Sequence, residues 1–348
     1  MGGEGGQGSL ARYGAHPPHA KGAKIPKVQT CSPLLSVYFS GIEQLAAILQ
    51  AAGFQLELRQ LEGGLCEGQV QRLQLGSLQL LRIRLNRSLV VIGDKALGRL
   101  LLCLSLVPPS PGGVGLQSHG KSIGEAELYG VDSQLPIHLV TPSSYTLAIA
   151  SINREMLFEQ AEALGAPDLA KLLGSSNVLS LQQKRLEALR RCITNLFAMP
   201  AVGPGPPPEN DLLPLLIEAI VDGKERQQGK QRLPPRFEIV QLVERWALEN
   251  PSTPISLDEL CRQVYASRRS LIQGFQEHLG MPPMRFIRLQ RLHGVRRALL
   301  EAQQTERSVA ELAGAWGFNS SGHFSRNYQQ LFGELPHQTL QRGRRGAS

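Results

Sequence analysis

The sequence contains few cysteines, few aromatic residues and, in its last third, no lysine. Its 5 cysteines are scattered, and no two have the spacing of a zinc cluster or a disulfide framework. They are Cys31, Cys66, Cys103, Cys192 and Cys261. This distribution predicts a protein of a reducing cytoplasm with no metal site.

Long apolar runs are also missing. No stretch has the length and hydrophobicity of a transmembrane helix. The first residues are rich in glycine and basic side chains and lack the apolar core of a secretory signal. We therefore expect residues 1–28 to form a disordered tail, and the protein to be cytoplasmic and not bound to a membrane.

What the chain does contain is positive charge. Its 348 residues suit two domains, and its net charge of +8 favours a polyanionic partner, which could be DNA, RNA or an acidic membrane. After Lys230 every basic side chain other than histidine is an arginine. The planar guanidinium group of arginine matches phosphates and guanine edges, which favours a nucleic acid.

The N-terminal half has the pattern of a β-rich domain. Apolar residues alternate from Phe54 to about Ala150, and glycine- and proline-rich turns interrupt them, which predicts antiparallel strands in a small sandwich or barrel. We expect helices to follow, one of them starting at a capping box of Ser180 and Gln183. Its apolar stripe is either domain core or a dimer seam. The stripe consists of Leu186, Leu189, Ile193 and Leu196.

These patterns place a ligand-sensing and dimerisation domain at residues 29–200. The segment 201–234 begins with a proline-rich stretch, which predicts a linker. We expect this linker to contain a short helix at 211–221.

An internal repeat lies in the last third of the chain, between residues 256–283 and 308–336. Each copy opens with a capping box, Ser256 with Glu259 or Ser308 with Glu311, and restarts at a second serine. The second halves match at a constant offset. The pairs are Leu271 with Phe324, Phe275 with Tyr328, Leu279 with Phe332, Gly280 with Gly333 and Pro283 with Pro336. Two short helices joined by a tight turn expose the second helix to a DNA major groove, so the repeat predicts two helix-turn-helix units.

A third pattern joins the two units. From Pro283 an apolar stripe predicts a connecting helix, and arginines occupy its other side. We expect an α+β protein, with an N-terminal β-rich sensor module followed by an all-α domain at 235–341 and a basic tail at 342–348. In that all-α domain a linker helix joins two helix-turn-helix units.

Residues 235–341 resemble the DNA-binding domain of the AraC/XylS family of bacterial regulators. The resemblance rests on W-G-F-x-x-x-G-x-F-S-R-x-Y-x-x-x-F-G-x-x-P, from Trp316 to Pro336. Short segments from Ser267, Arg291 and Tyr328 are similar to the subgroup that regulates ethanolamine-utilisation operons.

The resemblance implies which residues touch DNA. The expected contacts are Ser267, Arg268, Arg269, Ile272, Gln273, Arg296, Ser320, Ser321, Gly322, His323, Ser325 and Arg326. Arg269 and Gln273, four residues apart on one helical face, suit guanine and adenine edges. Two glycines depart from an ideal reading helix. Gly274 costs about 1 kcal/mol relative to alanine, and Gly322 offers no side chain.

The family further implies double-stranded DNA and RNA polymerase as partners, a homodimer, and a small effector bound to the sensor domain. Ethanolamine and adenosylcobalamin are the effectors that the subgroup implies. Bound to DNA, the protein would associate with the nucleoid. Activation and repression stay open at this point.

Other functions fit less well. His119 and His138 stand alone, and the chain lacks nucleotide-binding and nucleophile-elbow motifs, so we expect no enzyme. A basic module that binds proteins or membrane surfaces is the main alternative, but its apolar residues are needed for a core. RNA binding would require exposed aromatic residues, and here the aromatics occupy core-facing positions.

Overall fold

The computed structural model describes residues 34–107, 115–131, 135–175, 177–198, 209–225, 234–302 and 307–345. The expected tail at 1–28 and the proline-rich start of the expected linker lie outside these residues. Within the described ranges, no helix combines the length and hydrophobicity that crossing a membrane requires.

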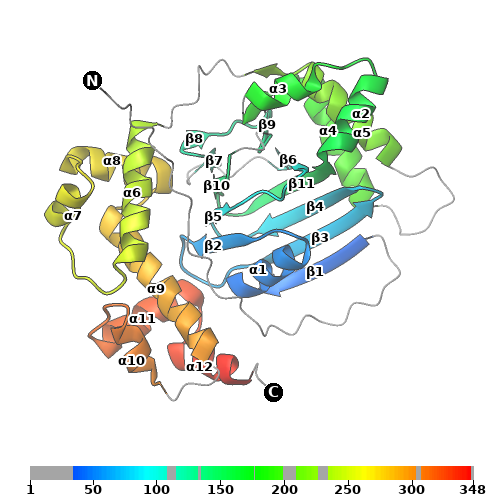
Figure 1. Cartoon of the computed structure of the whole chain (residues 1–348). Coiled ribbons are helices and arrows are strands. Elements are labelled where there is room, and N and C mark those ends of the chain that lie inside the picture. The colour runs from blue at the N-terminus through cyan, green and yellow to red at the C-terminus, as the bar shows by residue number, and fades with distance from the viewer. Residues whose placement is uncertain are drawn as a thin grey trace, which may run out of the picture.

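Two antiparallel sheets form the N-terminal domain (Figure 1). In spatial order, the eight-stranded sheet contains β1 (Leu34–Ser40), β3 (Glu67–Leu75), β4 (Leu78–Leu85), β11 (Tyr145–Asn153), β6 (Arg99–Ser105), β9 (Glu127–Tyr129), β12 (Val178–Ser180) and β13 (Lys224–Glu225). The five-stranded sheet contains β2 (Leu56–Gln60), β5 (Leu89–Gly93), β10 (Ile137–Val140), β7 (Gln117–Ser118) and β8 (Lys121–Ser122). The period of two in the sequence therefore corresponds to antiparallel strands, as expected.

Side chains fill the space between the two sheets. Alternate residues of β4, among them Leu81 and Ile83, point into this core and meet Tyr145 of β11. Helix α1 (Ile42–Ala51) packs against the same core with Leu45 and Leu49.

The outer face of the larger sheet is covered by α2 (Arg154–Ala163), α3 (Leu169–Ser175), α4 (Gln183–Ala198) and α5 (Glu209–Val221). The apolar stripe of α4 is buried here, and Leu189 has 0% of its surface exposed. Because the stripe packs within its own domain, its interpretation as a dimer seam is wrong. The expected start of this helix also shifts: Ser180 belongs to β12, and α4 begins at Gln183.

The N-terminal β-rich domain is longer than the sequence predicted. Leu212, Leu216 and Ile217 of α5 lie in the same core as α4, and β13 pairs with β12. The short helix expected within a linker is therefore an integral helix of the N-terminal domain, because its apolar side completes the cover of the sheet.

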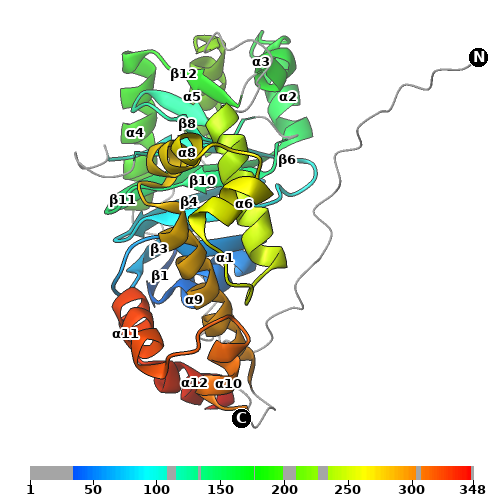
Figure 2. The same cartoon turned by 90° about the vertical axis from the view of Figure 1, so that its left-hand side faces the viewer.

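The C-terminal helices form one domain, which packs against the outer face of the five-stranded sheet (Figures 1 and 2). They are α6 (Pro235–Glu249), α7 (Leu257–Gln263), α8 (Arg268–Leu279), α9 (Pro283–Glu301), α10 (Val309–Gly314), α11 (Ser321–Phe332) and α12 (Pro336–Arg345). Val90 and Val140 of the sheet share one core with Val240 and Val243 of α6. The two domains are thus joined by an apolar interface, and the α+β architecture is confirmed.

The expected basic tail at 342–348 is helical over most of its length. Helix α12 continues to Arg345, and Arg342 forms an ion pair with Glu334 at 2.8 Å. That pair and the helical hydrogen bonds hold these residues to the second unit.

Candidate nucleic-acid interface

The first helix-turn-helix unit consists of α7 and α8. The Ser256 side chain accepts a hydrogen bond from the Glu259 amide at 3.2 Å, and Ser267 accepts one from the Ser270 amide at 3.1 Å. Between the helices, Tyr265 adopts a left-handed conformation with φ 50°, and Gly280 ends α8 at φ 65°. The capping serines and the terminal glycine read from the sequence therefore set the limits of these helices.

The second unit, α10 and α11, repeats this construction except at Ser320, whose side chain makes no capping hydrogen bond. Ser308 and Glu311 form a reciprocal capping box: the Glu311 amide donates to the Ser308 hydroxyl at 3.2 Å, and the Ser308 amide and hydroxyl donate to the Glu311 carboxylate at 2.7 Å and 2.8 Å. The two bonds to the carboxylate lower the pKa of Glu311. Gly317, at φ 79°, takes the left-handed position, and Gly333 ends α11. The turn has one residue more than in the first unit, which explains why the repeat offset changes from 52 before the turn to 53 after it.

Helix α9 carries one unit at each end (Figures 1 and 2). It has 19 residues, which corresponds to a length of about 28 Å. Its buried side packs in the same core as both units, and Leu292, Val295 and Leu299 have at most 2% of their surface exposed. A continuous helix fixed at both ends keeps the two recognition helices at a constant separation.

The expected reading residues of α8 and α11 lie on the outer surface. The inner side of the two helices, with Leu271, Phe275, Phe324 and Tyr328, is buried. The exposed residues are Ser267, Arg268, Arg269, Ile272, Ser320, Ser321, Gly322, His323 and Arg326, whereas Gln273 and Ser325 are half-buried.

Two arginines on this surface are available to bind an anion. Arg269 and Arg326 are exposed, and neither forms an ion pair with the residues that the structure describes. Arg268 lies 3.6 Å from Asp258, and both side chains are largely exposed, so this pair is weak.

Arg296 is placed differently from the expectation. Its side chain is only 4% exposed, and it forms ion pairs with Glu43 at 2.5 Å and Glu334 at 2.7 Å. Burial works against its charge, but the hydrogen bond and charge of Glu43 raise the pKa of Arg296 above its usual value. Arg296 is therefore an interior residue in this structure and does not belong to the DNA-facing surface.

Gly274, which interrupts the first recognition helix, has a packing role. A Cβ atom at this position would lie 2.9 Å from the Arg236 carbonyl oxygen of α6. The helix therefore gives up about 1 kcal/mol of helix propensity for a close approach of α6 and α8. At Gly322 a Cβ would meet nothing within 4 Å.

Gly294 in α9 is a second glycine in a close packing contact. A Cβ atom there would lie 2.2 Å from the ring of Trp316, so Gly294→Ala forces that ring to move. We expect a loss of about 1–3 kcal/mol in unfolding free energy, reduced by the better helix propensity of alanine. Chemical denaturation measures the loss, and Gly322→Ala is the matched control, which should be neutral or stabilising. Equal midpoints for the two variants would contradict this packing.

The N-terminal domain contacts the C-terminal ends of both α8 and α11. At α11, the Gly64 amide donates to the Gln330 carbonyl at 2.9 Å, and Gln60 donates to the Leu331 carbonyl at 3.0 Å. At α8, Gln117 donates to the Glu277 carbonyl at 2.8 Å. The N-terminal halves, which carry the expected reading residues, point away from these contacts.

Sequence reasoning missed the residues that join the domains. Glu43, which binds Arg296, is separated from it by 253 residues, and no local pattern links the two. It also treated His138 as isolated, whereas His138 lies 3.3 Å from Glu244 of α6 in the buried interface. The sequence signal for this contact was His138 itself, a polar residue on the otherwise apolar outer face of a period-two strand.

Comparison with known proteins agrees with this organisation. A helix-turn-helix domain family matches residues 260–342. "XylDLEGF operon transcriptional activator 2" of Pseudomonas putida is 40% identical over 125 residues, which cover 36% of this chain and 77% of that protein. "XylDLEGF operon transcriptional activator 3" of the same organism is 35% identical over 127 residues, but they cover only 37% of its length.

A solved structure also matches part of the chain. It is "a probable AraC family transcriptional regulator from Rhodopseudomonas palustris CGA009", with 36% identity, 97% of that protein and 30% of this chain covered, and a TM-score of 0.29.

Taken together, the fold and the duplicated unit define a helix-turn-helix protein with a separate β-rich domain. The chain belongs to the AraC/XylS family of transcription regulators. These are DNA-binding proteins rather than enzymes.

Proposed function

We propose that this chain is a one-component transcription activator of a metabolic operon, which binds duplex DNA sequence-specifically with α8 and α11 in adjacent major grooves. The observation that carries the proposal is the repeated unit at the two ends of α9, with polar residues outward on both second helices. Half-sites one helical turn apart are separated by about 34 Å, close to the length of this connector. The names of the matched relatives support activation.

The roles of the reading residues follow from their chemistry. Arg269 and Gln273 share one face of α8 and pair best with guanine and adenine edges. Arg326 occupies the corresponding region of α11. Ser267 and Ser320 lie at helix N-termini, where amide groups favour phosphate oxygens.

Binding-site selection from a random duplex library tests this proposal with the full-length protein. Arg269→Ala and Arg326→Ala should each lose discrimination at one half-site, by about 1–3 kcal/mol per base pair. Arg307→Ala is a matched control, because Arg307 is exposed but precedes α10. If both reading variants keep the wild-type preference, the assignment of the reading faces is wrong. No duplex binding at low salt would contradict DNA binding itself.

The remaining partners are part of the same proposal. A regulator of this kind acts in the cytoplasm at the nucleoid, contacts RNA polymerase and gains operator affinity as a homodimer. The stripe of α4 is not available for that dimer. Ethanolamine with adenosylcobalamin is the effector pair to test first, on the similarity of the segments from Ser267, Arg291 and Tyr328. The relatives described above have names that point to other operons.

A further inference from the structure

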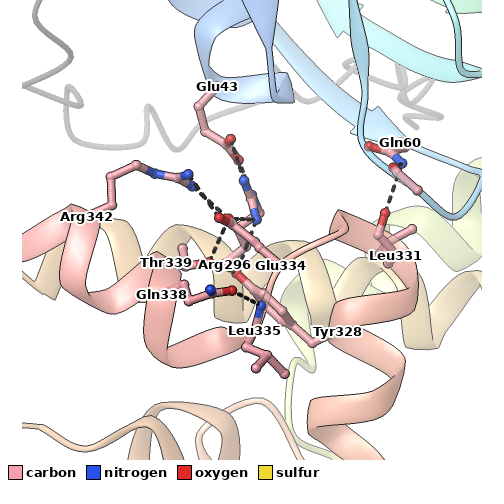
Figure 3. Close-up of polar contacts among 11 residues, drawn as sticks. Glu43, Gln60, Arg296, Tyr328, Leu331, Glu334, Leu335, Gln338, Thr339 and Arg342 are labelled. Atoms are coloured by element: carbon pink, nitrogen blue, oxygen red, sulfur yellow. Dashed lines mark hydrogen bonds and ion pairs between the residues drawn. The ribbon is translucent and has the colours of Figure 1, made fainter.

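An ionic cluster with a buried centre connects the sensor domain to the second helix-turn-helix unit (Figure 3). Its centre is Arg296 of α9. Its Nε and Nη2 atoms donate to the two carboxylate oxygens of Glu43 at 2.5 Å and 2.9 Å, and Nη1 donates to Glu334 at 2.7 Å. Two carboxylates on different elements thus share one guanidinium group.

The second unit surrounds the other side of this guanidinium group. The Tyr328 hydroxyl lies 3.4 Å from Nη1, and the guanidinium carbon lies 4.4 Å from the centre of the Phe332 ring. Both residues are on the inner face of α11, one turn apart. Glu334 is held in turn by Arg342 and by the Thr339 hydroxyl, both of α12. Arg296 therefore fixes α11 and α12 against α9.

Glu43 supplies hydrogen-bond acceptors for Arg296 that the DNA-binding domain lacks. Without its carboxylate, Nε and Nη2 of a nearly fully buried cation would have no acceptor among the described residues. Neighbouring contacts reinforce the link, since Gln60 donates to the Leu331 carbonyl and accepts from His293 at 3.0 Å. The sensor thus completes the site that holds the second unit.

We propose that Arg296 is a positioning residue for the second recognition helix, and that Glu43 makes this positioning depend on the sensor domain. The inference rests on the proposed reading of DNA by two helices. Arg296 acts from the interior on the orientation of α11, and the bases are read by the outward residues of that helix. Loss of the Glu43 contact frees α11 and leaves α8 in place.

Hydrogen exchange of the free, full-length protein tests the contact without DNA. Glu43→Gln places an amide donor against the guanidinium donors, so peptides of α11 and α12 should exchange several-fold faster, and peptides of α8 should not change. Glu43→Asp keeps the charge and should restore part of the protection. Glu159→Gln, an exposed carboxylate of α2, is the matched control. Equal exchange of α11 in Glu43→Gln and in this control would overturn the proposal.

Binding-site selection with variants of the ionic cluster tests the consequence. Glu43→Gln and Glu334→Gln should lose discrimination about tenfold at the half-site that Arg326→Ala identifies, and not at the Arg269→Ala half-site. An equal loss at both half-sites reports a general structural defect and overturns the positioning role. A lower salt slope in Arg296→Met than in the wild type would assign Arg296 to a phosphate and also overturn it.

If the proposed reading of DNA by two helices is wrong, binding-site selection gives a different result. In that case the wild type selects no sequence, or Arg269→Ala and Arg326→Ala leave its preference unchanged. The exchange experiment still decides whether Glu43 and Arg296 hold the second unit.

Discussion

Leu189→Arg is expected to unfold the sensor domain. Leu189 has no exposed surface and lies in the core between α4 and the larger sheet. The substitution removes a buried apolar side chain and introduces a charge with no partner, at a combined cost of about 5 kcal/mol or more. This approaches the whole stability of a typical domain, which is about 5–15 kcal/mol. Circular dichroism against denaturant and sedimentation measure the fold and the association state.

Thr194→Arg is the matched control, because Thr194 is exposed on the same helix. We expect this variant to keep the stability of the wild type within about 0.5 kcal/mol. A Leu189→Arg protein that stays folded and only changes its association state would show that α4 forms a seam between subunits after all.

Mild acid is expected to weaken the contact between the two domains. Burial of the ring in the interface lowers the pKa of His293 to about 4, and the hydrogen bond that the ring donates to the Gln60 carbonyl opposes this shift only in part. Burial also lowers the pKa of His278, which faces Gln117 of the sensor, Phe237 of α6, and the charges of Glu277 and Arg236. The docked form therefore disfavours protonation of both rings.

The direction of the pH effect follows from these lowered values. Once the domains separate, the His293 pKa returns to about 6.5. Below this pH the separated form therefore binds a proton at His293, and the docked form does not until the pH is near 4. Docking is therefore at full strength above pH 6.5 and weakens as the pH falls towards 4. One unit of pKa shift corresponds to about 1.4 kcal/mol, so the total for His293 is on the order of 3 kcal/mol. Glu43 partly opposes this effect, whereas Arg59 and Arg296 add to it.

Urea denaturation between pH 7.5 and 5 measures this loss. His293→Gln keeps a donor for the Gln60 carbonyl but does not titrate, so its midpoint should depend less on pH. His323→Gln, an exposed histidine of α11, should behave as the wild type does. Parallel pH profiles for His293→Gln and the wild type would show that this ring does not report on docking.

Local patterns predicted most helix limits in the DNA-binding domain. Ser256, Ser267 and Ser308 cap helices where the sequence places them, and Gly280 and Gly333 end them. A cap acts on amides within the next turn, so its effect can be read from neighbouring residues. Gly274 could be interpreted from neighbouring residues only in part. Its low helix propensity is a local property, but the close approach that requires a glycine is to the Arg236 carbonyl on another helix.

The sequence by itself determined the β-rich and helical halves, the duplicated unit and the outward residues of its second helices, because each depends on periodicity within a short segment. Tertiary structure alone decided that the stripe of α4 is core, that α5 belongs to the sensor, and that Arg296 is interior. An apolar stripe or a basic helix face has the same pattern whichever surface covers it. Arg296 is paired with Glu43, which is 253 residues away in the sequence. Only the packing of the two domains could therefore show that Arg296 is interior.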